Sequence, residues 1–399
     1  MLTPAEADRL IGEHLPCLPI ESLPLLQCAG AVLRENVYAE RDQPPFDRVA
    51  MDGIALDSHA VRAGTRRFRI QAMQAAGDAP LSLAAPEQCI EIMTGAMLAL
   101  GCDAVVPVER LTVRDGIAEL ETGLTVAPWQ NVHRRGSDCR QGTLLLTSGT
   151  CLNAPEIAVA ASAGMNRIRV SIQPAIAVIS TGTELVEPGE PILAHQVRRS
   201  NAYGLVAALR KRGFGRVADD HVIDDASELK QRLKFHLDTH DVLVLSGGVS
   251  AGRLDLVPQI LQELGVRTIF HKIAQRPGKP LWFGTAPSGA TVFALPGNPV
   301  STLVCLARYV VPALQAAMGR APSAPERIAL GAPVRAAASL ATFMPVRIEG
   351  DEWGRSWAVP APTNGSGDFT SLVGTDGFVE LPPGTGEHPR GFVTRLYRW

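Results

Sequence analysis

The chain has 399 residues, of which 46% are hydrophobic, with 38 basic and 40 acidic side chains. This length favours two to four domains, and the balanced charge argues against a nucleic-acid-binding protein. No uninterrupted apolar run reaches the roughly 18 residues of a membrane span. The first ten residues include acidic side chains and do not resemble a signal peptide. We therefore expect a cytoplasmic protein with no membrane segment.

The cysteines and histidines form no metal-binding motif in the sequence. None of the seven cysteines makes a C-x-x-C pair, and none of the nine histidines belongs to an H-E-x-x-H motif. This pattern favours reduced, mostly buried thiols over a zinc site or a disulfide framework. The common nucleotide motifs G-x-x-x-x-G-K-[ST] and G-x-G-x-x-G are absent too.

The first part of the chain predicts a helix followed by a β-rich lobe. The sequence Thr3-Pro4-Ala5-Glu6 is a capping box with proline at the first helical position, so we expect a helix to about Leu15. Short strand-like segments then follow within residues 50–140, at 68–72, 89–93, 104–108 and 117–120. We assign residues 1–173 to an N-terminal region that contains this lobe.

The middle of the chain alternates buried strands and helices. Continuous apolar runs at 175–180, 241–246 and 291–295 are typical of strands buried on both faces. Helices are expected from Asn201, a candidate N-cap, to Gly213, from Asp225 onward, and over residues 255–264 and 300–318. Residues 174–320 should therefore form a doubly wound α/β domain with a mostly parallel sheet. Residues 321–399 predict a C-terminal β domain, which makes the whole chain a multidomain α/β plus β protein.

Unusual loops follow the three buried strands. Ligands of open α/β sheets bind beyond the carboxyl ends of the strands. We therefore expect three loops to converge on one crevice at this edge of the sheet: 180–184, 246–255 and 296–299. Their glycines allow backbone amides to approach a phosphate. Glu184, Asp224 and Asp255 each lie just past a strand, and carboxylates beside a phosphate site suggest Mg²⁺. A helix cap remains the alternative for Asp224 or Asp225.

A cationic turn follows at 272–279, K-I-A-Q-R-P-G-K. Lys272, Arg276 and Lys279 suit an anionic ligand held by a rigid Pro-Gly turn. The alternative is a surface turn whose charges are only solvated.

Residues 248–252, G-V-S-A-G, also match the nucleophile elbow of serine hydrolases. Ser250 would then be a nucleophile. The spacing disfavours this alternative, because an elbow serine directly follows its strand and here the strand is expected to end at Ser246. A histidine in the usual later position is missing as well.

Taken together, the motifs resemble the molybdopterin molybdenumtransferase family, MoeA of bacteria and the E domain of gephyrin. The resemblance runs nearly end to end through the segments P-P-F-D (44–47), A-M-D-G (50–53), I-M-T-G-A (92–96), N-V-H-R-R-G-S-D (131–138), S-T-G-T-E-L (180–185), D-D (224–225), S-G-G-V-S (246–250), P-G-K-P (277–280), L-P-G-N-P (295–299) and G-S-G-D (365–368). The chain differs from the usual family sequence at Arg48, Val49, His133, Thr183 and Arg276.

The resemblance implies an elongated four-domain protomer that forms a homodimer, with an α/β domain like the free-standing molybdopterin adenylyltransferase. It implies an enzyme that uses adenylylated molybdopterin, molybdate and a divalent cation, forms molybdenum cofactor and releases AMP. Expected partners are the adenylyltransferase and downstream cofactor-transfer proteins or molybdoenzymes. The alternative in this family is a non-catalytic carrier or scaffold.

The resemblance also assigns roles by position. Glu184, Asp224 and Asp255 are implied to bind metal and act in hydrolysis. Asp52, Thr94 and Asp138 are implied to complete the cleft from the other subunit. The remaining implied residues bind the pterin nucleotide or oxyanion: Ser246, Gly247, Gly248, Ser250, Lys272, Arg276, Lys279, Pro296, Gly297, Asn298, Pro299 and Ser366.

Overall fold

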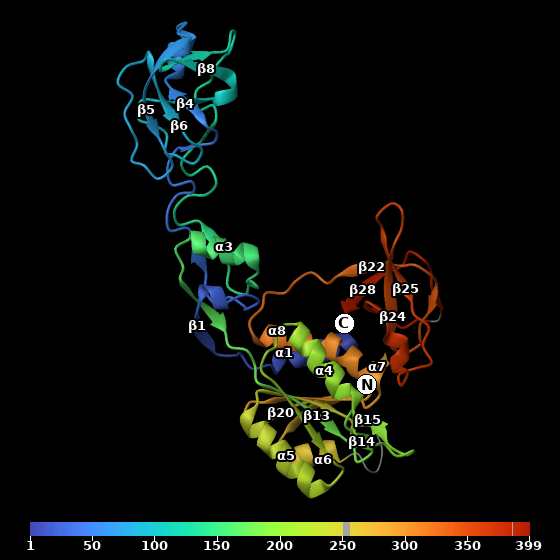
Figure 1. Ribbon diagram of the computed structural model, residues 1–399. Coiled ribbons are helices and arrows are strands. Elements are labelled where there is room, and N and C mark those ends of the chain that lie inside the picture. Colours follow the sequence, from blue (N-terminus) through green and yellow to red (C-terminus); the bar gives the residue numbers. More distant parts are fainter. Residues whose placement is uncertain (250–255, 385) are drawn as a thin grey trace.

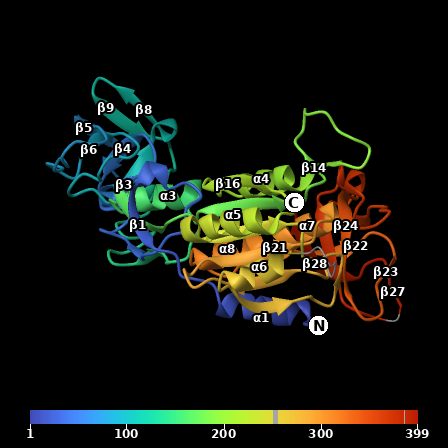
Figure 2. The same ribbon diagram turned by 90° about the horizontal axis from the view of Figure 1, so that it is seen from below.

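The computed structural model describes residues 1–249, 256–384 and 386–399. The molecule is elongated (Figure 1). A β-rich lobe lies at one end, and a narrow connecting part joins it to the α/β domain and the C-terminal domain at the other end. Figure 2 shows the same separation from below, with the C-terminal domain against the α/β domain and the lobe on the opposite side.

The N-terminal lobe is a single six-stranded sheet. It contains the four expected strands, with small changes at their ends, and two that were not expected. Phe68, Ile90 and Ala104 lie in its core and are fully buried. In spatial order the strands are β7 (Ala104–Pro107), β4 (Gly53–Leu56), β6 (Gln88–Ile92), β5 (Arg67–Gln74), β9 (Ile117–Leu120) and β8 (Leu111–Arg114), with helix α2 (Ser58–Arg62) at the end of β4.

The connecting part consists of two-stranded ladders, because the chain leaves for the lobe and later returns beside itself. Its helix α3 (Ala154–Ser162) packs on β11. The antiparallel pairs are β1 (Ile20–Pro24) with β12 (Arg167–Ser171), β2 (Val37–Tyr38) with β11 (Leu144–Leu146), and β3 (Arg48–Val49) with β10 (Val132–His133).

The α/β domain has the expected mostly parallel sheet. Its first four strands run parallel, and its last two join as antiparallel neighbours. The order is β16 (Val217–Val222), β13 (Ile176–Thr181), β17 (Val242–Ser246), β21 (Thr291–Leu295), β20 (Trp282–Thr285) and β18 (Arg267–His271). Beside this sheet, β14 (Leu185–Val186) and β15 (Val197–Arg198) form a small parallel ladder.

Helices cover both faces of this sheet, which is why its strands are apolar throughout. One face packs on α4 (Ser200–Lys211), the long C-terminal helix of the domain and α1 (Pro4–Glu13). The other face packs on α5 (Ala226–Thr239) and α6 (Val257–Glu263). The capping box at Thr3 is confirmed. Asn201 as an N-cap is wrong: α4 begins at Ser200 with Arg199 at the cap, and Asn201 lies inside the helix, where its amide bonds across to neighbouring loops.

The expected helix at 300–318 contains a π-helical turn. It runs through α7 (Pro299–Cys305), η3 (Leu306–Val310) and α8 (Val311–Ala317). This segment, Pro299–Ala317, is long and apolar enough to cross a membrane, but 78% of the window is buried within the protein. That burial is what the core helix of a folded domain shows.

The C-terminal domain is a β structure, as expected. Strand β24 pairs with both β25 and β26, so five strands close into a ring. The order is β24 (Ala341–Gly350), β25 (Ser356–Pro360), β22 (Arg327–Leu330), β28 (Val393–Arg398) and β26 (Gly377–Leu381), with β23 (Val334–Arg335) paired to β27 (Glu387–His388). A strand from the preceding domain, β19 (Gln275–Arg276), adds to this sheet by pairing in parallel with β24.

Candidate active site

The three loops at the carboxyl edge of the α/β sheet meet around one pocket. Its volume is about 340 Å³. Loop residues from the ends of β13, β17 and β21 form its walls, as the topology of an open α/β sheet requires. The lining residues are Thr181, Gly182, Glu184, Asp224, Gly247, Gly248, Val249, Pro280, Pro296, Gly297 and Asn298.

Two glycines bring the backbone into this pocket at positions that a side chain would block. Gly247 has φ 103° and Gly248 has φ 66°. A Cβ on Gly247 would lie 2.6 Å from the Thr181 carbonyl oxygen, and one on Gly248 would lie 2.7 Å from a methyl group of Val257. The close packing leaves their backbone at the pocket wall, the arrangement by which glycine-rich turns bind anions.

Thr181 contributes a hydroxyl without a partner. Its Oγ1 is buried and makes no hydrogen bond to the described residues. A buried hydroxyl normally has a partner because leaving it unpaired costs free energy. Since Thr181 lines the pocket, its hydroxyl is a candidate to bind a polar group of a ligand.

Two of the three expected carboxylates line the pocket together. Glu184 and Asp224 are both exposed on its wall. Asp224 is tied to the first loop, since the Thr183 amide donates to its Oδ2 over 3.3 Å and its own amide donates to Thr183 Oγ1 over 3.1 Å. The helix-cap alternative holds for Asp225 and not for Asp224, because Asp225 caps α5 by accepting from the amides of residues 227 and 228.

The donor set fits a magnesium ion that is completed by a substrate. Mg²⁺ usually binds through one or two carboxylates plus phosphate oxygens and water, and Glu184 with Asp224 supply two carboxylates. Within residues 1–249, 256–384 and 386–399, no group of three metal-binding side chains forms. Asp255 and Ser250 lie outside the described residues.

Asn201 holds the second and third loops together, a role that the sequence did not suggest. Its Nδ2 donates to Ser246 Oγ over 3.0 Å and to the Gly297 carbonyl over 2.7 Å. Ser246 is buried and lies below the pocket rather than on its wall. An asparagine at the start of a helix looks like a cap in sequence, so this tertiary role had no local signal.

A buried arginine supports the first loop. Arg199 is 4% exposed, and its Nε donates to Ser180 Oγ over 3.2 Å. It also forms ion pairs with Glu187 and Asp219. Burial alone would lower the pKa of Arg199, but the hydrogen bonds to these carboxylates outweigh it and raise the pKa. The guanidinium therefore stays charged and fixes the end of β13 to β16 and the loop after β14.

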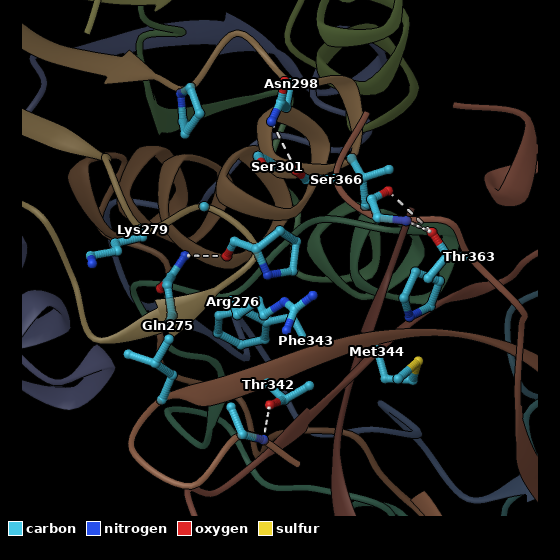
Figure 3. Close-up of a pocket in the computed structure, with 18 of the residues that line it drawn as sticks. Gln275, Arg276, Lys279, Asn298, Ser301, Thr342, Phe343, Met344, Thr363 and Ser366 are labelled. Atoms are coloured by element: carbon cyan, nitrogen blue, oxygen red, sulfur yellow. Dashed lines mark hydrogen bonds between the residues drawn. The ribbon is translucent and has the colours of Figure 1, made fainter. Parts of the chain in front are cut away.

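A larger pocket of about 1030 Å³ opens next to the first, between the α/β and C-terminal domains. Figure 3 shows residues of both domains around it, including the cations Arg276 and Lys279. Pro280, Pro296 and Asn298 line both pockets. The Asn298 Nδ2 donates to Ser366 Oγ over 2.8 Å and so links the two domains.

The expected cations do not all reach this pocket. Arg276, Lys279 and Arg335 line it, but Lys272 lines neither pocket, although it was expected to act with the other two. Lys272 instead has φ 77° directly after β18, where the chain turns. Pro299 begins helix α7 and is likewise not among the lining residues.

The remaining expected site residues lie outside the α/β domain: Asp52 directly precedes β4 and Thr94 follows β6 in the lobe, and Asp138 lies between β10 and β11 in the connecting part. The lobe lies at the opposite end of the molecule from the α/β domain (Figure 1). Asp52 and Thr94 are paired: the Thr94 hydroxyl and amide each donate to Asp52 Oδ1 over 2.7 Å. These bonds lower the pKa of Asp52. Asp138 is exposed on a loop, and its backbone amide donates to the Gln43 carbonyl oxygen. A single chain therefore does not bring these three residues to the carboxylates of the α/β domain.

Three family descriptions match consecutive parts of the chain. Residues 2–164 match the MoeA N-terminal region (domain I and II), and residues 177–316 match a probable molybdopterin binding domain. Residues 327–393 match the MoeA C-terminal region (domain IV).

Relatives match over the full length. A protein of Synechocystis sp. named molybdopterin molybdenumtransferase is 37% identical over 400 residues and covers 100% of both chains. One of the same name from Synechococcus elongatus is 35% identical over 95% of each chain. The solved structure of the molybdopterin biosynthesis MoeA protein from Pyrococcus horikoshii has a TM-score of 0.81 and 30% identity, and the match covers 100% of this chain and 99% of that one. The chain therefore belongs to the molybdopterin molybdenumtransferase family.

Proposed function

We propose that this protein is a molybdenum insertase, a transferase that uses molybdate and adenylylated molybdopterin to form molybdenum cofactor with release of AMP. The observation that carries the proposal is the single pocket formed by three strand-end loops, with glycine backbone, an unpaired threonine hydroxyl and two carboxylates on its wall. Family membership supplies the reaction, and this pocket supplies groups suited to a phosphoanhydride substrate.

The roles follow from the chemistry of the lining groups. The backbone at Gly247 and Gly248 and the Thr181 hydroxyl bind phosphate and pterin oxygens. Glu184 orients the water that attacks the phosphoanhydride, and AMP is the leaving group. Arg276 and Lys279, at the adjoining pocket, attract the molybdate dianion.

We also propose Mg²⁺ as the cofactor, held by Glu184 and Asp224. When bound, it would neutralise charge that develops on the phosphate oxygens. The two carboxylates face the pocket without an ion pair among the described residues, so they are available to a cation.

The active form is proposed to be a homodimer in the cytoplasm. Asp52, Thr94 and Asp138 of a second copy would complete the cleft, since within one chain they belong to the lobe and the connecting part and do not line the pocket. All seven cysteines are free thiols, which suits a reducing compartment. The enzyme would take its substrate from a molybdopterin adenylyltransferase and pass its product to cofactor-transfer proteins or molybdoenzymes.

The test is an assay of AMP release from adenylylated molybdopterin with molybdate and MgCl₂, with an EDTA-treated sample as the control. Release of AMP together with active cofactor is expected, and EDTA should abolish it. Binding of the nucleotide without AMP release would instead support a carrier of the same fold.

A further inference from the structure

A fully buried glutamine lies at the wall of the larger pocket. Gln275 is 0% exposed and belongs to β19, the strand that the α/β domain adds to the C-terminal sheet. Its Oε1 accepts a hydrogen bond from the Tyr309 hydroxyl, and its Nε2 donates to the Pro277 carbonyl over 3.1 Å. The amide thus bonds both the long helix and the turn that follows β19. Figure 3 shows the second of these bonds, from Gln275.

The long helix at 299–317 also contacts the turn after β19 at a second point. Cys305, one helical turn before Tyr309, donates its thiol to the Gly278 carbonyl over 3.8 Å. A Cβ on Gly278 would lie 2.6 Å from both Cys305 Sγ and Gln275 Nε2. Burial raises the pKa of Tyr309, so its hydroxyl remains a neutral donor. The residues from Gln275 to Gly278 are therefore packed tightly against the helix.

This turn carries the two cations that the proposed function needs. Arg276 and Lys279 are exposed, line the pocket, and form no ion pair with the described residues. Within the part of the chain that the structure describes, no side-chain partner fixes their position in the pocket. The backbone alone places them, and the amide of Gln275 braces that backbone.

We propose that Gln275 and Tyr309 are positioning residues that hold Arg276 and Lys279 at the oxyanion pocket. Neither touches the substrate; they act through the turn. This inference rests on the proposed function, because it concerns the binding of molybdate at that same site. A purely structural role would lower stability without changing the affinity for molybdate selectively.

The decisive variant is Tyr309→Phe, which removes one hydroxyl and keeps the ring. The KM for molybdate should rise about five- to tenfold, the scale of one lost hydrogen bond, while kcat changes less than twofold. Gln275→Met, which at similar volume removes all three side-chain bonds of Gln275, including the one from Nε2 to Cys305 Sγ, should raise the KM further. Titration calorimetry with molybdate alone should show the same loss of affinity.

The matched control is Tyr397→Phe. This tyrosine is also largely buried and donates to Glu380 Oε2 over 2.7 Å, but it lines neither active-site pocket. It should lower the thermal midpoint and leave the KM for molybdate unchanged. An unchanged KM in Tyr309→Phe, or a loss of kcat alone, would overturn the inference.

A ligand-free measurement separates this inference from the proposed function. Amide hydrogen exchange over residues 274–281 should become faster in Tyr309→Phe and remain unchanged in Tyr397→Phe. Unchanged exchange in Tyr309→Phe contradicts the positioning role even if the wild-type protein releases no AMP. Faster exchange with no AMP release by the wild type contradicts only the proposed function.

Discussion

At the scale of single residues, Gly248, like its neighbour Gly247, combines two constraints on any side chain. Its positive φ disfavours any side chain, and a Cβ would also lie 2.7 Å from Val257 and 2.9 Å from Thr181 Oγ1. Gly289 also has a positive φ, but nothing lies within 4 Å of the position that a Cβ would take there. A comparison of alanine substitutions at Gly248 and Gly289 therefore separates the cost of backbone strain from the cost of steric contact.

Gly248→Ala should therefore be more harmful than Gly289→Ala. The control should cost about 1 kcal/mol from strain alone, and Gly248→Ala should cost at least about 1 kcal/mol more because its neighbours must move. Nucleotide binding should weaken only in Gly248→Ala. Thermal unfolding and titration calorimetry with adenylylated molybdopterin would check this; equal effects of the two variants would contradict it.

Glu184 is expected to act in the reaction more than in binding. Glu184→Gln keeps the shape of the side chain but removes its charge, so it can neither orient water as a base nor hold a cation strongly. AMP release should fall at least about a hundredfold, while adenylylated molybdopterin still binds. Glu228→Gln, which changes an exposed carboxylate on α5 that lines neither pocket, is the control. AMP release by Glu184→Gln within a fewfold of wild type would refute the role.

The contribution of Asp52 to the stability of the fold should depend on pH in a defined direction. Thr94 lowers its pKa, so the ionised form stabilises the fold above the unfolded pKa of about 3.9, and this stabilisation is lost as the pH falls through the lower folded pKa. Thr94→Val should raise the pKa of Asp52, as measured by NMR titration of its carboxyl carbon. Thr112→Val, at an exposed position on β8, should not. A pKa of Asp52 that stays as low in Thr94→Val would exclude the hydroxyl as its cause.

At the scale of elements, helix α4 links the loops that form the first pocket. Asn201 on this helix bonds to Ser246 and Gly297. Asn201→Leu should lower stability by about 1–3 kcal/mol, because partners in a buried network lose their bonds. Arg210→Gln, at an exposed position on the same helix, is the control. Binding of adenylylated molybdopterin should weaken only in Asn201→Leu, and equal binding by both variants would contradict the linking role.

The sequence predicted those elements whose local pattern is strong. The strand at 291–295 matches β21 (Thr291–Leu295), because five buried residues in an almost wholly apolar run allow few other structures. The capping box at Thr3 is equally local. The prediction for Asn201 was wrong for the opposite reason: its residue type favours a cap, and only tertiary packing directs its amide to Ser246.

The candidate site was predicted in part. The convergence of the three loops followed from the topology of a parallel sheet, which brings strand ends to one edge. The contact of Thr181 with the glycine turn, and the bond from Tyr309 to Gln275, join segments far apart in the sequence and had no local signal. The roles of Asp52 and Asp138 came only from the family resemblance and stay predictions.

At the scale of the whole molecule, the separation of the lobe from the α/β domain determines how the site could be assembled. Asp52 directly precedes β4 and Glu184 directly precedes β14, and these strands lie at opposite ends of the elongated molecule (Figure 1). If both act in one cleft, the cleft must combine two chains. Closed twofold dimers make two such clefts, each with the lobe of one subunit and the α/β domain of the other.

Mixing two inactive variants tests this arrangement. Asp52→Ala and Glu184→Gln should each be inactive, yet half of the randomly exchanged dimers carry one wild-type cleft. Activity should recover to about a quarter of the wild-type value, given equal mixing and independent clefts. Glu184→Gln mixed with Asp224→Asn is the control, because both defects lie in the α/β domain and every cleft keeps one. If the first mixture stays inactive although subunit exchange is demonstrated, each site is built within one chain and Asp52 does not contribute to the partner's cleft.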